Sequence, residues 1–113
     1  MDADDRQLLQ TATWIFARHG QHARARVLCE FLVEDDPRDG VAAAALAEML
    51  LEDHEAETAL AVLRAADYPP ELTRAEALLE TRALVQLGRR EDADRRWKRF
   101  VASQRGGNRS WVG

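Results

Sequence analysis

The fold is read most directly from the stretch Leu84-Val85-Gln86-Leu87-Gly88-Arg89-Arg90-Glu91-Asp92-Ala93. A glycine here separates two segments whose apolar residues have helical spacing, which predicts a tight turn between two helices. The same arrangement surrounds Gly20. His54, in a polar break between apolar segments, lies midway between these glycines, so that turn signals recur every 34 residues. A fixed period of this length predicts helical pairs that stack on one another.

Other positions keep the same period. Small residues recur before each turn, at Thr13, Ala47 and Thr81, and after it, at Ala25, Ala59 and Ala93. Apolar residues recur close to them, at Phe16, Leu50 and Leu84 before the turn and at Cys29, Leu63 and Trp97 after it. Small side chains at Ala25, Ala59 and Ala93 let paired helices approach closely. Glycine at a turn tolerates a positive φ and therefore ends the first helix of a pair.

This period and these residues resemble the tetratricopeptide repeat family. The resemblance implies an all-α chain of three helix-turn-helix repeats, at about 6–39, 40–73 and 74–107, that form a short right-handed α-solenoid. The chain departs from the family pattern in three ways. The signature Trp and Tyr are missing, Glu80 stands where an apolar residue is usual, and Pro69-Pro70 ends the second repeat early.

Composition agrees with helices. The 113 residues include twenty Ala and fourteen Leu but thirteen Val, Ile and Thr together, and Ala and Leu are the stronger helix formers. We expect helices at about 5–19, 22–35, 40–52, 55–67, 71–87 and 90–103, with Asp39 as the N-cap of the third and Pro70 at the start of the fifth. Residues 1–103 then form one domain, and 104–113 are expected to be a flexible tail.

The location expected from the sequence is the cytoplasm. The longest apolar run, residues 41–47, is too short to span a membrane. The acidic start Met1-Asp2-Ala3-Asp4-Asp5 is unlike a signal peptide. A single cysteine excludes an internal disulfide and fits a reducing compartment.

The first helices of successive pairs are expected to line a concave surface. On these helices, an i, i+3, i+7, i+10 stripe is largely apolar, with Glu48 and Arg82 opposed across it, and an exposed apolar groove usually marks a binding site. The residues of this stripe predicted to bind a partner are Gln10, Trp14, Ala44, Glu48, Leu51, Leu78, Arg82 and Val85. The alternative is that some of them belong to the core, if the register is shifted by one residue.

The last helix presents a second apolar face. Trp97, Phe100 and Val101 fall where a fourth repeat would stack, but neither a fourth repeat nor a polar capping helix follows. These residues either fold back onto the third pair or form a secondary interface with a partner. A second copy of the chain is one such partner.

Catalytic and metal-binding interpretations are poorly supported. His19, His22, Cys29 and His54 lack the tight local pairs of zinc ligands, and a buried free Cys behaves as a small hydrophobe. Phosphate-binding loops, nucleophile elbows and His-Glu-x-x-His motifs are absent from the sequence. We therefore expect no enzyme activity, no cofactor and no metal.

The charge is uneven along the chain. The net charge is −4, yet residues 89–113 carry eight basic and three acidic residues, whereas 1–88 carry eight Arg and seventeen acidic residues. Acidic residues interrupt the basic ones and stacking aromatics are few, so we expect no nucleic-acid partner. The alternative is a scaffold or regulatory adaptor that uses the Arg-rich end.

Two stretches carry a closer resemblance. Thr13-Trp14-Ile15-Phe16-Ala17-Arg18-His19-Gly20-Gln21-His22-Ala23-Arg24-Ala25-Arg26-Val27-Leu28 looks like the opening of the YscY-type chaperones of bacterial type III secretion, and residues 84–97 resemble their last repeat. Class II translocator chaperones have similar repeats. The resemblance implies a cytoplasmic, non-enzymatic escort that forms a heterodimer with a small secreted subunit, and the pair engages the export-gate protein. A homodimer is a possibility for the unliganded chain.

Overall fold

The computed structural model describes the backbone of residues 1–112 and the side chains of residues 1–105. This part of the chain folds into six α-helices and contains no strand, so the predicted all-α class is confirmed. The helices are α1 (Ala3–Arg18), α2 (His22–Asp35), α3 (Gly40–Glu52), α4 (Ala56–Ala65), α5 (Thr73–Gln86) and α6 (Arg90–Val112), with one turn of 3-10 helix, η1 (Pro70–Leu72), before α5.

The turns inside the three hairpins α1–α2, α3–α4 and α5–α6 have one geometry. Gly20, His54 and Gly88 have positive φ angles of 72°, 60° and 75°. In each turn, the N–H of the following residue donates to a carbonyl five residues earlier, at 2.8 Å: Gln21 to Phe16, Glu55 to Leu50 and Arg89 to Leu84. A left-handed residue with this bond satisfies carbonyls that would otherwise be left free at the end of the first helix.

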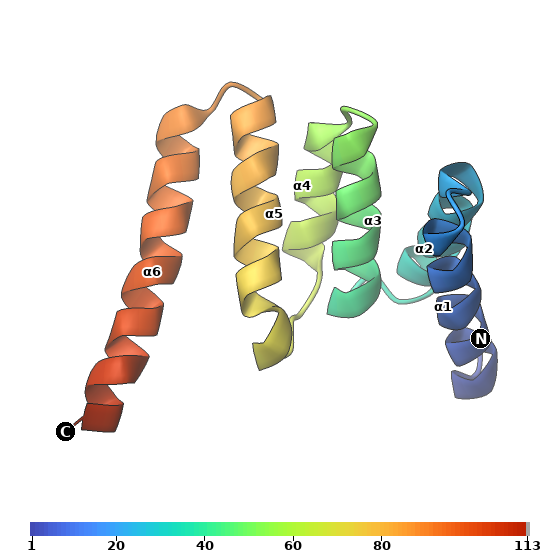
Figure 1. Cartoon of the computed structure of the whole chain (residues 1–113), viewed down its shortest axis with the longest axis horizontal. Coiled ribbons are helices and arrows are strands. Elements are labelled where there is room, and N and C mark those ends of the chain that lie inside the picture. The colour runs from blue at the N-terminus through green and yellow to red at the C-terminus, as the bar shows by residue number, and fades with distance from the viewer. Residues whose placement is uncertain (113) are drawn as a thin grey trace.

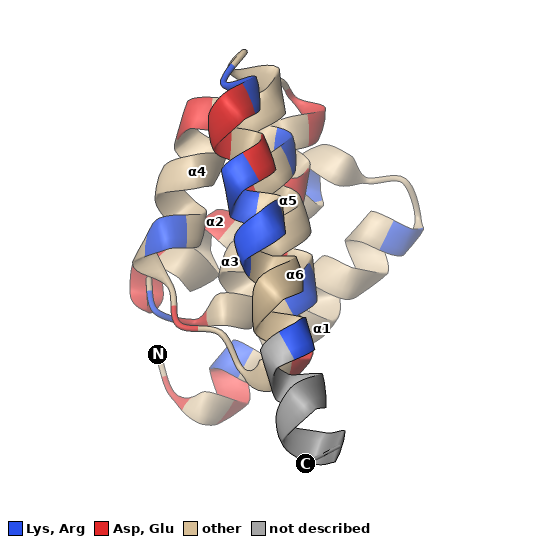
Figure 2. Cartoon of the chain, turned by 90° about the vertical axis from the view of Figure 1, so that its left-hand side faces the viewer, with Lys and Arg blue, Asp and Glu red and all other residues tan. Residues whose placement is uncertain are grey.

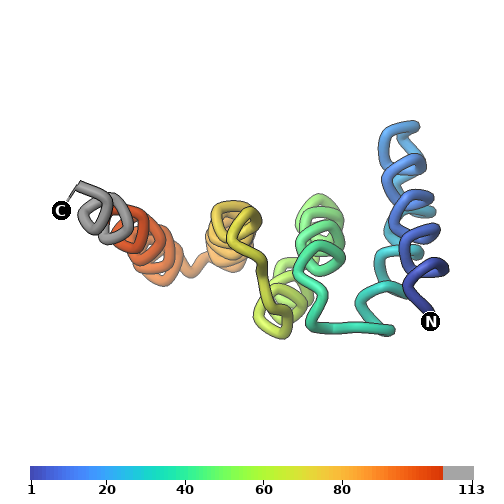
Figure 3. Tube along the Cα trace, turned by 90° about the horizontal axis from the view of Figure 1, so that it is seen from below, coloured from blue at the N-terminus to red at the C-terminus, as the bar shows by residue number. Residues whose placement is uncertain are grey.

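The hairpins lie side by side along the longest dimension of the molecule, which measures 44 × 35 × 24 Å (Figure 1). The α1–α2 hairpin forms one end and α6 forms the other (Figures 1 and 3). Successive hairpins meet where α2 packs on α3 and α4 packs on α5, and α3 also packs on α5. The central helix α3 is therefore surrounded on three sides.

The core sits around α3, α4 and α5. The alanines expected at close helix contacts, Ala25, Ala59 and Ala93, are buried. Leucines of the three central helices fill the space between them, and Cys29 joins this core from α2. Alanine at the crossings permits the close approach, and the leucines supply most of the apolar area removed from water.

Asp39 begins α3 as predicted. Its carboxylate accepts hydrogen bonds from the N–H groups of Val41 and Ala42, at 3.0 and 3.2 Å. Gly40 follows because a Cβ atom there would lie 2.3 Å from the carbonyl oxygen of Asp67. The chain between α4 and α5 thus crosses directly over the start of α3.

Two helices differ in length from the prediction. The fourth ends at Ala65 rather than near residue 67, because Ala66 is extended and the N–H of Asp67 donates to the carbonyl of Arg38 at 2.9 Å. The sixth continues to Val112 rather than ending near residue 103. The side chains of residues 106–113 lie outside the described residues, and the flexible tail at 104–113 stays a prediction.

Candidate partner-binding groove

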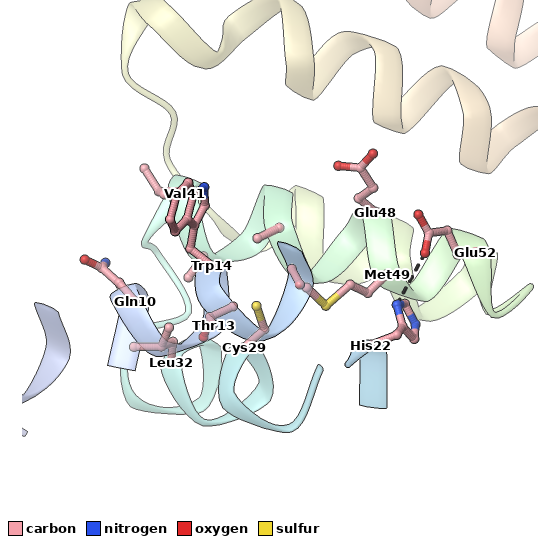
Figure 4. A pocket seen from close by; sticks show the side chains of 13 residues that line it. Gln10, Thr13, Trp14, His22, Cys29, Leu32, Val41, Glu48, Met49 and Glu52 are labelled. Carbon is pink, nitrogen blue, oxygen red and sulfur yellow. Dashed lines mark ion pairs between the residues drawn. The ribbon is translucent and has the colours of Figure 1, made fainter. Parts of the chain in front are cut away.

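An open groove of about 400 Å³ lies between α1 and α3, and α2 forms its floor (Figure 4). Most of its lining is apolar, and its charged side chains stand at one end. It is lined by Gln10, Thr13, Trp14 and Ala17 of α1, His22, Cys29 and Leu32 of α2, and Val41, Ala42, Ala45, Glu48, Met49 and Glu52 of α3. The groove belongs to the first hairpin and the helix that follows it.

The α1 wall presents an aromatic side chain to solvent. Gln10, Thr13, Trp14 and Ala17 share one face because they are spaced i, i+3, i+4, i+7. Thr13 is buried, and its hydroxyl donates to the carbonyl of Leu9 at 2.8 Å. The side chain of Trp14 is 59% exposed and stands opposite α3 (Figure 4), and the guanidinium of Arg18 lies 4.6 Å from the centroid of its ring. This cation–π contact favours one orientation of an otherwise open indole.

The floor of the groove is formed by apolar residues and by an uncharged thiol. Cys29 and Leu32 are buried beneath Trp14 and Met49 (Figure 4). Burial raises the pKa of the Cys29 thiol to about 11, so that the group stays protonated at neutral pH. A protonated buried thiol packs as a small hydrophobe and adds no charge to the groove.

One end of the groove is acidic. Glu48 and Glu52 of α3 are exposed there. The imidazole of His22 lies between two carboxylates: its Nδ1 is 3.3 Å from Glu52, and its Nε2 is 3.3 Å from Asp53. Hydrogen bonds from Arg26 and His22 lower the pKa of Asp53, whose carboxylate forms an ion pair with Arg26 beside this end of the groove.

The structure divides the predicted binding residues. Gln10, Trp14 and Glu48 line the groove. Leu78, Arg82 and Val85 are exposed on α5, outside the groove lining, and Ala44 is half-buried against the core. Of the stripe expected from the sequence, the part beside α1 lines the groove, and the α5 part lies outside the groove lining.

Leu51 was predicted to face the groove, and this prediction was wrong. Its side chain is 1% exposed within the core cluster, and its carbonyl accepts a hydrogen bond from Nε2 of Gln86 at 3.1 Å. The open face of α3 follows i, i+4, i+7, i+11 from Val41 to Glu52, whereas the i+10 position turns toward α5. The stripe was misplaced because α3 packs against α5 but is separated from α1.

The sequence interpretation missed several lining residues. Met49 and Ala45 extend the open face of α3 at the i+4 spacing from Val41, and His22, Cys29 and Leu32 form the floor. The run Val41-Ala45-Met49 is visible in the sequence as a helical stripe. The floor was not visible there, because it depends on the distance between α1 and α3.

The secondary face on α6 is partly covered. Trp97, Phe100 and Val101 are half-buried, and the rings of Trp97 and Phe100 pack with centroids 5.3 Å apart. Phe100 also lines a shallow depression with Tyr68 and Pro70. Phe100 thus lies beside the segment that leads into α5, and the choice between folding back and a secondary interface stays open for this face.

Basic residues recur along α6 (Figure 2), and Arg95, Arg96 and Lys98 form ion pairs. Arg96 donates to Glu76 at 2.8 Å and to Glu80 at 3.0 Å. Glu80, the residue at a usually apolar position, is buried, and Arg64 approaches it at 3.4 Å. Burial opposes ionisation of Glu80, but the hydrogen bonds from Arg96 outweigh it and lower its pKa. Arg96 is therefore used inside the fold, whereas Arg95 and Lys98 pair with carboxylates of α6 itself.

No protein-family model matches the chain, and neither a curated protein nor a solved structure matches it. Among the helices described, none has both the length and the apolar character needed to cross a membrane.

Proposed function

We propose that this chain is a protein-binding module that holds an apolar helical segment of a partner in the groove between α1 and α3. The observation that carries the proposal is the exposed Trp14 beside an apolar, hollowed floor. A large indole left in water beside apolar side chains is costly, and Trp is among the residues most often found at the energetic centres of protein interfaces. A partner that covers Trp14 removes this cost.

The lining favours one kind of occupant. Apolar side chains at i, i+3/i+4 and i+7 of an amphipathic helix can enter a groove whose two walls are themselves helices. Glu48 and Glu52 at one end favour Lys or Arg on the flank of that helix. The occupant proposed is therefore an amphipathic helix with an apolar face and a basic flank.

We propose further that the hairpins are three tetratricopeptide-like repeats stacked as a short solenoid. The identical turn bonds at Gly20, His54 and Gly88, and the buried alanines five residues after each, support this proposal. Both sets recur at the period of that family. Such repeats commonly present their concave side to another protein.

The narrower proposal is a cytoplasmic chaperone of type III secretion, which would bind a small secreted subunit and escort it to the export gate. It rests on the sequence resemblance at residues 13–28 and 84–97, together with a groove suited to shielding an aggregation-prone helix. A general repeat scaffold that binds through the exposed basic residues of α6 is the second candidate. Steep salt dependence of partner binding would favour the scaffold.

Site-specific photocrosslinking in the native cell tests the groove. The photoreactive group is placed at Ala17, which is exposed on the groove wall, or at Ala61, which is exposed on α4. We expect one partner to be crosslinked from position 17 and not from position 61, with the attachment mapped to a segment of amphipathic helical pattern. Trp14→Glu should abolish the crosslink, while Ala61→Glu should leave it.

Two results would contradict the proposal. Equal crosslinking from both positions would place the partner elsewhere, and a Trp14→Glu variant with unchanged capture and unchanged far-UV circular dichroism would show that the indole is not needed. Leu78→Asp on α5 tests how far the partner extends. Weakened capture with this variant would mean that the partner continues across α5.

A further inference from the structure

The outer face of the first hairpin carries an apolar patch that the groove does not use. Leu8, Ile15, Val27 and Phe31, here called the end patch, are 68%, 44%, 51% and 57% exposed. The hairpin forms one end of the molecule (Figures 1 and 3), and within the described part of the chain these four side chains are open to solvent. Val27 and Phe31 lie one turn apart on α2, and Leu8 and Ile15 lie two turns apart on α1. Exposed apolar side chains gathered on one face mark an interaction surface.

The end patch points away from the groove. On α2, the core-facing residues are Ala25, Cys29 and Leu32, and Val27 and Phe31 lie on the opposite side of the helix. On α1, Leu8 and Ile15 are seven residues apart and lie opposite Thr13, which is buried. A partner can therefore cover the end patch while another occupies the groove.

Charged residues flank the end patch with opposite signs. On α2, Arg24 lies one turn before Val27 and Glu34 lies one turn after Phe31, on the same face of the helix. On α1, Asp4 lies one turn before Leu8. Arg6 donates to Asp35 at 2.7 Å, which shows that the start of α1 lies beside the end of α2. Both acidic residues therefore stand at the open end of the hairpin, and Arg24 stands at the turn end.

These charges are available to a partner. Within the part of the chain whose side chains are described, neither Asp4 nor Glu34 forms an ion pair, and the guanidinium of Arg24 lies 5.8 Å from the centroid of the Phe16 ring without a carboxylate partner. The end patch thus has an acidic end, an apolar centre and a basic end. This polarity decides which second surface fits it.

We propose that the end patch binds the end patch of a second copy of this chain, with the two hairpins antiparallel about a two-fold axis. In that arrangement, Glu34 of each copy faces Arg24 of the other, and the apolar centres cover one another. A two-fold contact is closed and self-complementary, and it uses the same residues from both copies. A parallel arrangement would bring like charges together, which interfaces avoid.

The oligomeric state tests the proposal directly. Sedimentation velocity over roughly 1–200 µM, a range in which interfaces of modest affinity associate, should show a monomer of 12.8 kDa in equilibrium with a dimer. Phe31→Glu should weaken dimerisation by roughly tenfold or more, because it buries a charge at the apolar centre. The matched control is Val85→Glu, at a residue 50% exposed on α5, which should leave the dimer intact.

Charge exchange tests the antiparallel arrangement. Arg24→Glu alone and Glu34→Arg alone should each weaken the homodimer, because each places like charges at both contacts. Mixing the two variants should restore a dimer, since every Glu then faces an Arg. Circular dichroism and thermal melts of each variant verify that the fold is kept.

Several outcomes would overturn the proposal. A chain that stays monomeric throughout the concentration range has no such interface. A dimer that survives Phe31→Glu but is lost in Val85→Glu uses another face. Growth beyond a dimer, without rescue on mixing, indicates head-to-tail stacking of the end patch on the α6 face of the next copy.

Discussion

Replacing His54 by glycine tests whether the three hairpin turns are equivalent. His54 has a φ of 60°, close to the 72° and 75° of Gly20 and Gly88, so that the second turn places a side chain where the other two have none. A left-handed conformation costs an L-residue roughly 1–2 kcal/mol. Glycine avoids this cost but loses about 0.5–1 kcal/mol more backbone entropy on folding.

The difference predicts that His54→Gly stabilises the fold by about 0.5–1 kcal/mol. Loss of the imidazole should change the free energy of unfolding little, because His54 is exposed and no hydrogen bond or ion pair of its side chain is found within the described part of the chain. Since roughly 1 kcal/mol shifts the midpoint of a domain near this size by a few degrees, the thermal midpoint should rise by about 2–5 °C.

The matched control is Gly88→Ala. A Cβ at Gly88 would meet no atom within 4 Å, so that the substitution changes the backbone preference without a clash. It should destabilise the fold by about 1 kcal/mol. Urea unfolding followed by far-UV circular dichroism measures both variants, and equal m-values show that the denatured states are comparable.

One combination of results would show that the three hairpin turns are not equivalent. If Gly88→Ala destabilises as expected but His54→Gly is neutral or destabilising, the histidine contributes to stability through its side chain, and the turns are not equivalent. The three turns would then share one backbone conformation, but only the middle turn would depend on a side chain for its stability.

Three further predictions concern the core and the ion pairs. Ala59→Leu should destabilise the fold by roughly 1–3 kcal/mol in urea unfolding, because Ala59 is fully buried at a helix crossing and a larger side chain overpacks it. Arg96→Met should cost about 3 kcal/mol in the same assay by leaving Glu80 buried without its main partner, and adding Glu80→Leu should recover most of the loss. Burial opposes ionisation of Asp39, but the hydrogen bonds from Arg6 and the α3 amides outweigh it and hold the pKa of Asp39 below the usual 3.8. Ionised Asp39 therefore stabilises the fold above about pH 4, and this stabilisation is lost as the pH falls through the lowered pKa. Asp39→Asn keeps an N-cap, and should therefore flatten the acid limb of a stability-against-pH curve without removing α3. A neutral Ala59→Leu variant, a double variant no better than Arg96→Met, or an unchanged acid limb would contradict the respective argument.

The sequence was sufficient for the features that depend on local chemistry. The turn residues at the 34-residue period indicated three pairs of helices, and the small residues after each turn are buried as expected. Asp39 was recognised as an N-cap because its preference for that position is local. Such features need no knowledge of how one hairpin sits against the next.

The features that sequence reasoning missed depend on distances between hairpins. Leu51 was assigned to the open face because its spacing fits a stripe, but the contact of α3 with α5 buries it. Glu80 stood out in the sequence as an exception, yet its partner Arg96 lies on a different helix. A pattern along one helix cannot reveal which neighbour approaches it or how closely.

The way the first hairpin is held explains why a groove opens beside α1. Arg26 donates to Asp53 at 2.6 Å and also contacts Glu55, which ties the start of α2 to the α3–α4 turn. At the other end, Arg6 donates to Asp39 at 2.6 Å and ties the first turn of α1 to the start of α3. The turn end of α1, where Trp14 and Arg18 lie, is held mainly through α2. Both ends of the first hairpin are thus tied to α3 or to the turn that follows it, and among the described side chains no ion pair joins the middle of α1 to α3, where the groove lies.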